Sequence, residues 1–174
     1  MTEVFEKYLR SSIAISDEDI ATILALGTIK KLRKSQSLLH DGEVWRKMCF
    51  ILSGCCRLYR YDKNGDEHTV RFGVENWWMT DYLSYHNHIA SSFYLQAVEN
   101  SEVIAIDKTV FEALLIEIPN LERYFRIVTQ KSFGAMQMRI KYLFTMSAEE
   151  RYNHFNGLHP EFVQRVPQYM IASY

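Results

Sequence analysis

The fold is decided by a stretch that reads, from Phe50 to Phe72, Phe-Ile-Leu-Ser-Gly-Cys-Cys-Arg-Leu-Tyr-Arg-Tyr-Asp-Lys-Asn-Gly-Asp-Glu-His-Thr-Val-Arg-Phe. Its centre, Asn64-Gly65, is the strongest short-range signal for a tight hairpin turn, because both residues tolerate the positive φ angles that such a turn needs. The runs on either side are rich in aromatic and β-branched residues, the composition typical of strands. This stretch therefore predicts a β-hairpin.

Further strands are predicted on both sides of this hairpin. The glycines at positions 27, 42, 54, 65 and 73 separate short apolar runs, as the corners of a rolled sheet require. A spacing of about 8–12 residues between strands favours a sandwich or a barrel. In the second arm of the hairpin, alternation places Val70 and Phe72 on one face and Thr69 and Arg71 on the other. The predicted strands are Thr28–Leu32, Ser37–His40, Met48–Ser53, Arg57–Tyr61, His68–Phe72, Phe93–Ala97 and Val103–Asp107.

Helices are predicted before and after the strands. The first covers Glu3–Leu9, and the second follows Ser16, a suitable N-cap with acids in the next turn. After Asp107 the apolar period becomes helical, with a break at Ile118-Pro119. A long helix then runs to Met146. Shorter helices are predicted from Ser147 to about Phe155, from Pro160 and from Pro167.

The long helix carries a broad apolar stripe. This stripe packs onto the roll, or it pairs with the same helix of a second subunit. Its length beside a compact roll favours a dimer. The dimer candidates are Leu121, Tyr124, Phe125, Val128, Ala135, Met138 and Tyr142.

Composition limits the class of protein. The chain has 174 residues, of which 48% are hydrophobic and 14% aromatic, as in a folded domain. No apolar run approaches the roughly 20 residues of a membrane span, and the N-terminus lacks the features of a signal peptide. We therefore expect a cytoplasmic protein without membrane contact. The odd number of cysteines, with Cys55 and Cys56 adjacent, favours free buried thiols.

The charge is unevenly distributed along the chain. The formal net charge is −1, yet residues 123–174 carry more basic than acidic side chains. Five basic residues and no acid lie between Arg123 and Lys141. This run is either a solvated helix face or a surface that faces phosphates.

The elements, in this order, resemble the Crp/Fnr family of bacterial transcription regulators over nearly the whole chain. The resemblance implies a cyclic-nucleotide-binding-like β-roll sensor in residues 1–118, a dimerisation helix in 119–146 and the start of a helix-turn-helix in 147–174. The recognition helix would follow Tyr174, so the resemblance implies a homodimer that binds DNA in the complete protein. The strings that carry it are Leu39-His-Asp-Gly-Glu43, Phe50-Ile-Leu-Ser-Gly54, Arg57-Leu-Tyr-Arg-Tyr61, Glu99-Asn-Ser-Glu-Val-Ile-Ala-Ile106, Glu149-Glu-Arg-Tyr152 and Val166-Pro-Gln-Tyr-Met-Ile-Ala172.

The resemblance also places an effector pocket in residues 76–97. Members that bind cyclic nucleotides carry a Gly-Glu pair for the ribose and an Arg-Ser/Thr pair for the phosphate there. This chain has Thr80-Asp81 and Ser91-Ser92 at the corresponding positions. No Arg or Lys lies between residues 71 and 108, so a phosphate would meet only hydroxyls and amides, with Asp81 opposing it. We therefore predict that the chain does not bind cyclic AMP or cyclic GMP.

The same segment is rich in aromatic residues. These side chains either fill the roll as core or surround an uncharged or aromatic effector, and the sequence identifies no particular ligand. The candidate pocket residues are Trp78, Thr80, Asp81, Tyr82, Ser91, Ser92 and Phe93.

Two other functions are compatible with parts of the sequence. A stand-alone sensor of small molecules would act through protein contacts. A cupin-like metalloenzyme would use His86 and His88 as ligands, but the next acid, Glu99, is distant, and His154 lies in the helical tail. The sequence has no phosphate-binding glycine loop and no nucleophile-elbow motif. We therefore predict a protein that is not an enzyme and has no metal or cofactor.

Overall fold

The computed structural model describes residues 2–174. Two four-stranded antiparallel sheets form a β-roll, with strand orders β1-β8-β3-β6 and β2-β7-β4-β5. The strands are β1 (Thr28–Leu32), β2 (Ser37–Leu39), β3 (Lys47–Ser53), β4 (Cys56–Tyr61), β5 (Glu67–Gly73), β6 (Trp78–Met79), β7 (Tyr94–Ala97) and β8 (Ser101–Asp107).

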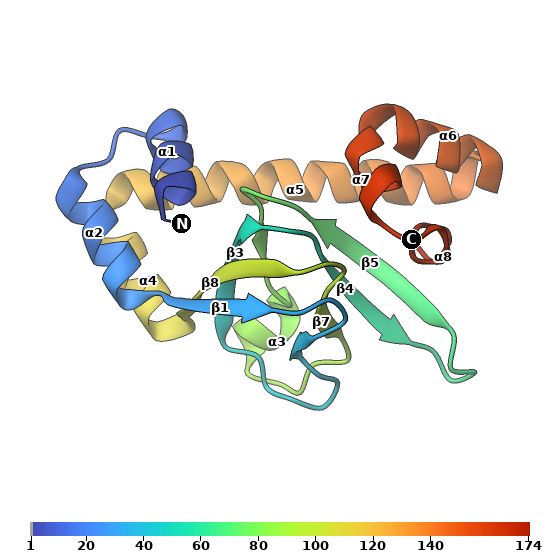
Figure 1. Cartoon of the computed structure of the whole chain (residues 1–174), viewed down its shortest axis with the longest axis horizontal. Helices are drawn as coiled ribbons and strands as arrows, with labels where there is room; N and C mark the ends of the chain where they lie inside the picture. Colours follow the sequence, from blue (N-terminus) through green and yellow to red (C-terminus); the bar gives the residue numbers. More distant parts are fainter. Residues whose placement is uncertain (1) are drawn as a thin grey trace.

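The helices are arranged along one long helix, α5. Figure 1 shows α5 running the full length of the molecule, with the roll below its middle, α1, α2 and α4 at one end and α6–α8 at the other. The predicted fold, an antiparallel β-roll with N-terminal helices and a long helix after it, is confirmed. The helices are α1 (Glu3–Ser12), α2 (Asp17–Leu26), α3 (Tyr82–Asn87), α4 (Lys108–Glu117), α5 (Pro119–Thr145), α6 (Ala148–Leu158), α7 (Pro160–Arg165) and α8 (Gln168–Ala172).

Element boundaries agree closely with the prediction. Each of the seven predicted strands is present, with its ends within two residues of the expected positions. Strand β6 was not predicted, because two residues are too few for a period of two to be recognised. Helices α1 and α6 each extend three residues beyond their predicted ends.

Strand β3 is buried on both faces, which explains its nearly continuous apolar sequence. Met48 and Phe50 point toward the helices, whereas Cys49 and Ile51 point between the two sheets. Two of the protein's hydrophobic cores therefore share β3, one inside the roll and one between the roll and the helices, and a third lies outside the second sheet.

The core between the roll and the helices is aromatic. The Trp78 ring lies at its centre, with ring centroids 5.0 Å from Phe50 and 4.6 Å from Phe125 in edge-to-face arrangements. Phe5 of α1 lies 4.8 Å from Phe50 in the same geometry. Such pairs contribute about 0.5–1.5 kcal/mol each beyond the area that they bury. They fix α1 and the first half of α5 against the roll.

The β4–β5 hairpin confirms the predicted turn. Gly65 has a φ of 87°, which a glycine adopts without strain. The Asp62 carboxylate accepts hydrogen bonds from the backbone N–H groups of Asn64 at 2.8 Å and Asp66 at 3.0 Å, and so closes the turn.

The predicted alternation in the second arm of this hairpin is wrong. A β-bulge at Val70 inserts an extra residue between the pairs Leu58–Arg71 and Tyr59–Thr69. Arg71 therefore shares a face with Leu58, whose side chain belongs to the core inside the roll. The bulge thus directs a basic side chain toward the inner side of the sheet.

Residues 160–174 pack back onto the outer face of the second sheet. Thr69 of the edge strand β5 donates its N–H to the carbonyl of Ser173 at 3.0 Å. Arg165 donates to both carboxylate oxygens of Glu75 at 2.8 and 2.9 Å and to Glu99 at 3.1 Å. The segment covers an edge strand, a position where unpaired backbone groups otherwise face solvent. The apolar side chains that it buries are Phe162, Val166, Met170 and Ile171.

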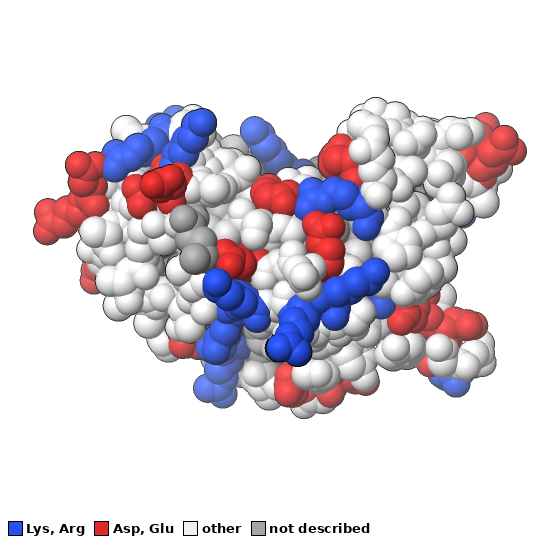
Figure 2. Space-filling view, viewed as in Figure 1, with Lys and Arg blue, Asp and Glu red and all other residues white. Residues whose placement is uncertain are grey.

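The face in Figure 2 carries acidic and basic side chains interspersed, with the largest basic group over β1 and the turn that follows it. The exposed basic residues of this group include Lys30, Lys31 and Lys34. Lys31 pairs with Glu102 at 3.3 Å. Among residues 2–174, no helix is both long enough and apolar enough to cross a membrane.

Candidate functional site

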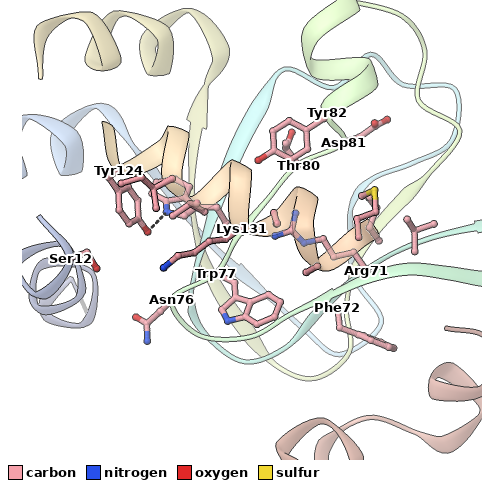
Figure 3. Close-up of a pocket in the computed structure, with 18 of the residues that line it drawn as sticks. Ser12, Arg71, Phe72, Asn76, Trp77, Thr80, Asp81, Tyr82, Tyr124 and Lys131 are labelled. Atoms are coloured by element: carbon pink, nitrogen blue, oxygen red, sulfur yellow. Dashed lines mark hydrogen bonds between the residues drawn. The ribbon is translucent and has the colours of Figure 1, made fainter. Parts of the chain in front are cut away.

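A cavity of about 1060 Å³ lies between the β-roll and α5. The hairpin contributes Leu58 and Arg71, the segment from Asn76 to the start of α3 contributes most of its residues up to Leu83, and α5 forms the opposite wall. Figure 3 shows side chains from these elements around the space. Its volume is at the upper end of the range for small-molecule sites.

The structure brings five of the seven predicted pocket residues to this cavity, namely Trp78, Thr80, Asp81, Tyr82 and Phe93. Strand β6 brings this segment close to α5, since the Trp78 ring packs against Phe125 with centroids 4.6 Å apart. Thus most of the predicted group converges on one site.

Ser91 and Ser92 do not line the cavity. The Ser91 hydroxyl accepts a hydrogen bond from the Phe93 N–H at 2.9 Å and is buried in the turn before β7. Ser92 is exposed to solvent. In this chain the pair shapes a turn and does not face a ligand.

Asp81 and Thr80 serve local structure as well as the cavity wall. Asp81 caps α3, because one carboxylate oxygen accepts from the N–H groups of Leu83 at 3.0 Å and Ser84 at 3.4 Å. The Thr80 hydroxyl donates to the carbonyl of Lys47 at 2.9 Å. The negative charge of Asp81 is thus partly balanced by the helix N-terminus.

Trp78 belongs to the aromatic core and to the cavity wall. Its indole N–H donates to the hydroxyl of Tyr124 at 3.3 Å, and that hydroxyl donates to Tyr8 at 2.9 Å. Burial raises the pKa of Tyr124 above its ordinary value, so this phenol stays protonated and keeps the chain of donors intact. Both roles considered for the aromatic residues, core and wall, therefore apply to this tryptophan.

One stripe of α5 faces the cavity. Tyr124, Val128, Lys131 and Ala135 follow each other at intervals of four, three and four residues, so they lie on one side of the helix, and all of them line the cavity. Three of these four were predicted as dimer contacts. In the structure they face the roll of their own chain.

The other predicted dimer residues have separate positions. Leu121 and Phe125 are buried in the chain's own core, with 1% and 7% of their surface exposed, so no surface remains for a partner. The Tyr142 ring packs against His154 of α6, with centroids 4.5 Å apart. Met138 is exposed. Part of the predicted stripe is therefore buried within the chain, whereas Ala135 and Met138 are exposed and stay candidates for a dimer contact.

Basic side chains reach the cavity from outside residues 76–97, the segment in which the effector pocket was predicted. Arg71 of β5 and Arg123, Lys131 and Arg139 of α5 all line it. Within residues 2–174, Arg71, Arg123 and Lys131 form no ion pair or side-chain hydrogen bond. Arg139 is engaged, since it donates to the carbonyls of Val70 and Thr69.

The premise that an anion would find only hydroxyls and amides is therefore wrong. Residues 72–107 carry no Arg or Lys, as the sequence shows. The bulge at Val70 turns Arg71 inward, and α5 brings Lys131 to the same space. In the sequence, the basic run between Arg123 and Lys141 was the available signal for basic side chains at the cavity. Its orientation relative to the roll, however, depends on tertiary packing.

The histidines considered as metal ligands have other neighbours. The Nε2 atom of His88 lies 3.1 Å from the ammonium of Lys108, and the His86 carbonyl accepts from the same ammonium at 3.2 Å. In the part of the chain that the structure describes, no group of three or more His, Cys, Asp or Glu side chains is placed to hold a metal ion.

Solved structures of regulators share this fold. The Catabolite Activator Protein of Thermus thermophilus aligns with a TM-score of 0.63 and 17% identity, over 75% of this chain and 61% of that one. The sensor domain of the regulator DNR from Pseudomonas aeruginosa gives 0.62 and 18%, over 80% and 91%. The c-di-GMP-responsive regulator CLP of Xanthomonas campestris gives 0.70 and 12%, over 84% and 74%. The TM-scores show a shared fold, and the chain spans 61% of the length of the Thermus protein.

Sequence families point the same way. No curated protein sequence matches the chain significantly. The family described as the cyclic nucleotide-binding domain matches residues 29–117, just over half of the chain. That range covers every strand except the first residue of β1, and it ends with α4. The resemblance to the Crp/Fnr regulators is thus confirmed in fold, and the chain belongs to the cyclic nucleotide-binding domain family.

Proposed function

We propose that this chain is the effector-sensing and dimerisation part of a transcription regulator of the Crp/Fnr type, and that it is not an enzyme. The observation that carries the proposal is the double role of α5. The helix forms one wall of the cavity, and elsewhere along its length it presents apolar side chains to solvent. A helix with both properties can couple ligand binding in the cavity to the association of two copies of the chain.

The exposed apolar stripe lies on the second half of α5. Its residues recur mostly every three to four positions, so they form one face about three turns long. This face adjoins the stripe that lines the cavity, and Met136 belongs to both. We propose that the same stripe of a second copy of the chain covers this face, because two identical helices can bury such a face symmetrically. The members of the stripe are Phe133, Met136, Ile140, Leu143 and Phe144.

The proposed mechanism is a population shift. A ligand that contacts Val128, Lys131 and Ala135 would favour one position of α5 relative to the roll. Since Phe133 and Met136 follow within the same two turns, this shift would change how the two α5 helices meet. In the complete protein, residues 147–174 would lead into a helix-turn-helix, and the change would re-aim the two DNA readers.

A stand-alone sensor is the second candidate, and a specific observation favours it. Residues 160–174 bury their apolar side chains against the roll, as an element of the sensor itself would. Such a protein would signal through protein contacts and would not need a second copy of the chain.

Sedimentation velocity over a concentration series tests the proposal. We expect a stable species of twice the 20.6 kDa chain mass at micromolar concentration. A monomer at every concentration would overturn the dimeric regulator and leave the stand-alone sensor. The measurement needs no ligand, so it is independent of effector identity.

A further inference from the structure

Residues 160–174, here called the strap, pack on the roll through a hydrophobic core of their own. The Phe162 ring of the strap lies against Phe72 of β5, with centroids 5.7 Å apart. This core is separate from the two cores that share β3. A unit with a separate core can open without unfolding the rest of the protein. The strap can therefore undock while the roll stays folded.

Two polar contacts hold the strap near its two ends. Near its start, Arg165 donates to both carboxylate oxygens of Glu75 at 2.8 and 2.9 Å, and these side chains are 28% and 36% exposed. Near its end, where α8 lies beside β5 (Figure 1), the Ser173 carbonyl accepts from the Thr69 N–H at 3.0 Å. The hydroxyls of Ser173 and Thr69 lie 2.7 Å apart. Because water reaches the Arg165 pair and can replace its hydrogen bonds, this contact is reversible.

A third contact joins the strap to α5. The Arg139 guanidinium, from the second half of α5, donates to the carbonyls of Val70 and Thr69 at 2.6 and 3.1 Å. Its central carbon lies 3.7 Å from the centre of the Tyr174 ring, within the range of a cation–π contact. Thr69 thus binds α5 through its carbonyl and the strap through its N–H. A displacement of α5 relative to β5 therefore disturbs the contacts of Arg139 with both the hairpin and the strap.

We propose that the strap is a releasable lock that holds the second half of α5 to the β4–β5 hairpin through Arg139, so that docking of the strap and the position of α5 depend on each other. The coupling is reciprocal, because each favours the other by the same free energy. The inference rests on the proposed function in one consequence. In that regulator the lock is autoinhibitory, since Phe162 and Met170 cannot be buried against the roll and in the core of a helix-turn-helix domain at the same time.

Hydrogen exchange of single amides, followed by NMR, tests the proposal. The reporters are the N–H groups of Val166 and Ile171, which donate to carbonyls within the strap. The reference is the set of β8 amides that pair with β3. In the unmodified chain we expect equal protection of the two reporters, at least about 100-fold below that of the β8 amides, because the strap opens as one unit without global unfolding.

Arg139→Gln should lower the protection of both reporters about tenfold, the cost of losing a hydrogen bond from a charged donor. Val166 is the decisive reporter, because it lies at the opposite end of the strap from the contact with Arg139. The β8 amides should fall by a similar factor, since the variant destabilises the folded state relative to every open state. Arg126→Gln, at an exposed position of the same helix, is the matched control and should change both reporters by less than about twofold.

Phe162→Asp tests the reverse direction. A carboxylate in place of a side chain that is 1% exposed undocks the strap. Because the coupling is reciprocal, we expect the α5 amides from 132 to 145 to lose protection about tenfold relative to those in the first half of the helix. Leu158→Asp, where the side chain is 59% exposed, is the matched control and should leave this ratio unchanged.

Three results would overturn the lock. A loss of protection at Ile171 alone in Arg139→Gln would mean that only the end of the strap frays. Equal protection of Val166 and the β8 amides in the unmodified chain would mean that the strap opens only with the whole protein. An unchanged ratio along α5 in a folded Phe162→Asp would mean that α5 does not depend on the strap. Should Phe162→Asp fail to fold, Arg139→Gln decides the question. A monomer in sedimentation velocity would overturn the dimeric regulator and leave the lock in place, so the two failures are distinguishable.

Discussion

The two halves of α5 differ in what they contact, although both are amphipathic. In the first half, Leu121 and Phe125 are buried among α1, α4 and the roll. In the second half, Phe133 and Phe144 are 61% and 85% exposed. The first half of the helix is therefore held by the chain's own core (the fixed half), and the second half carries an apolar face with no partner among residues 2–174 (the free half). A helix with one half fixed and an exposed apolar face on the other half can transmit a small displacement of the fixed half to that face.

The largest expected effect follows from breaking the fixed half. Phe125→Ala removes a ring whose centroid lies 4.6 Å from both Trp78 and Phe111. We expect a loss of about 3–5 kcal/mol in the free energy of unfolding, because a large buried side chain leaves a cavity. Urea denaturation measures it. Phe144→Ala is the matched control in the free half and should cost less than about 0.5 kcal/mol at concentrations where the chain is monomeric. Equal losses in the two variants would contradict the difference between the halves.

The next effect tests the free half. Ile140→Glu places a carboxylate in the middle of the exposed stripe, where two copies would bring two like charges together. We expect the dimer to dissociate at least about 100-fold more readily, which corresponds to about 2.7 kcal/mol. Sedimentation equilibrium gives the dissociation constant. Thr145→Glu, at an exposed position on the opposite side of the same helix, should leave that constant within about threefold. A dimer that survives Ile140→Glu would place the interface elsewhere.

The roll could be predicted from the sequence because its signals are local. Gly65 fixes a turn by its own φ preference, and Gly42 and Gly54 have positive φ angles in the same way. Ser147 and Glu150 form a capping box within four residues, at the predicted start of α6. None of these features depends on a distant part of the chain.

The cavity and the helix faces could be predicted only in part, because they depend on packing between distant elements. Periodicity identifies an apolar side of α5, but it cannot tell a chain's own core from a partner. Tyr124, Val128 and Ala135 were therefore assigned to a dimer and lie against the cavity. Arg71 was missed because a single bulge at Val70 decides which side of the sheet it faces.

A third experiment concerns how the free half is joined to the roll. Arg139 donates to the carbonyl of Val70 at 2.6 Å and to that of Thr69 at 3.1 Å, and it also contacts the Tyr174 carbonyl. Burial lowers the pKa of this guanidinium, so its hydrogen bonds offset a desolvation cost. We expect Arg139→Met to lower the free energy of unfolding by about 2 kcal/mol.

The control for this variant is Arg126→Met. Arg126 forms an exposed pair with Glu122 at 3.7 Å on the same helix. Exposed pairs of this type contribute about 0.3–0.5 kcal/mol, so the control should cost no more than that. Urea denaturation compares the two. Similar costs would mean that Arg139 does not join α5 to the hairpin.

Acid should loosen the end of the molecule around the free half before it affects the fixed half. Burial alone would raise the pKa of Glu75, but hydrogen bonds from Arg165 and the backbone outweigh it, and the pKa is lowered below 4.5. A carboxylate with a depressed folded pKa stabilises the protein above its unfolded pKa, and this contribution is lost as the pH falls through the folded value. Because both side chains are partly exposed, we expect about 1 kcal/mol or less.

The emission of Trp77 can report this loosening, since its ring lies 6.0 Å from Phe162 of α7. We expect a change below pH 4.5 in the difference between the protein and Trp77→Phe, whereas helical circular dichroism stays constant over the same range. In Glu75→Gln that acid transition should be absent. An unaltered transition in this variant would mean that another group controls the docking of residues 160–174.

The smallest effect concerns Gly134, which lies where the fixed half gives way to the free half. A glycine in a helix interior costs about 0.5–1 kcal/mol relative to alanine, because it loses more backbone freedom on folding. No atom lies within 4 Å of the position that a Cβ would occupy there. We therefore expect Gly134→Ala to raise the free energy of unfolding by about 0.5–1 kcal/mol in urea denaturation.

Gly157→Ala in α6 is the matched control, since a Cβ there also meets no atom within 4 Å. It should stabilise the protein by a similar amount if only helix propensity is involved. The two variants should differ in their effect on the dimer if bending at Gly134 lets the two halves of α5 move independently. In that case Gly134→Ala alone should change the dimer dissociation constant. A stiffer helix moves as one body, so the position of the fixed half then also sets the position of the stripe that begins at Phe133. Identical dissociation constants for both variants and the unmodified chain would mean that α5 already acts as one rigid rod.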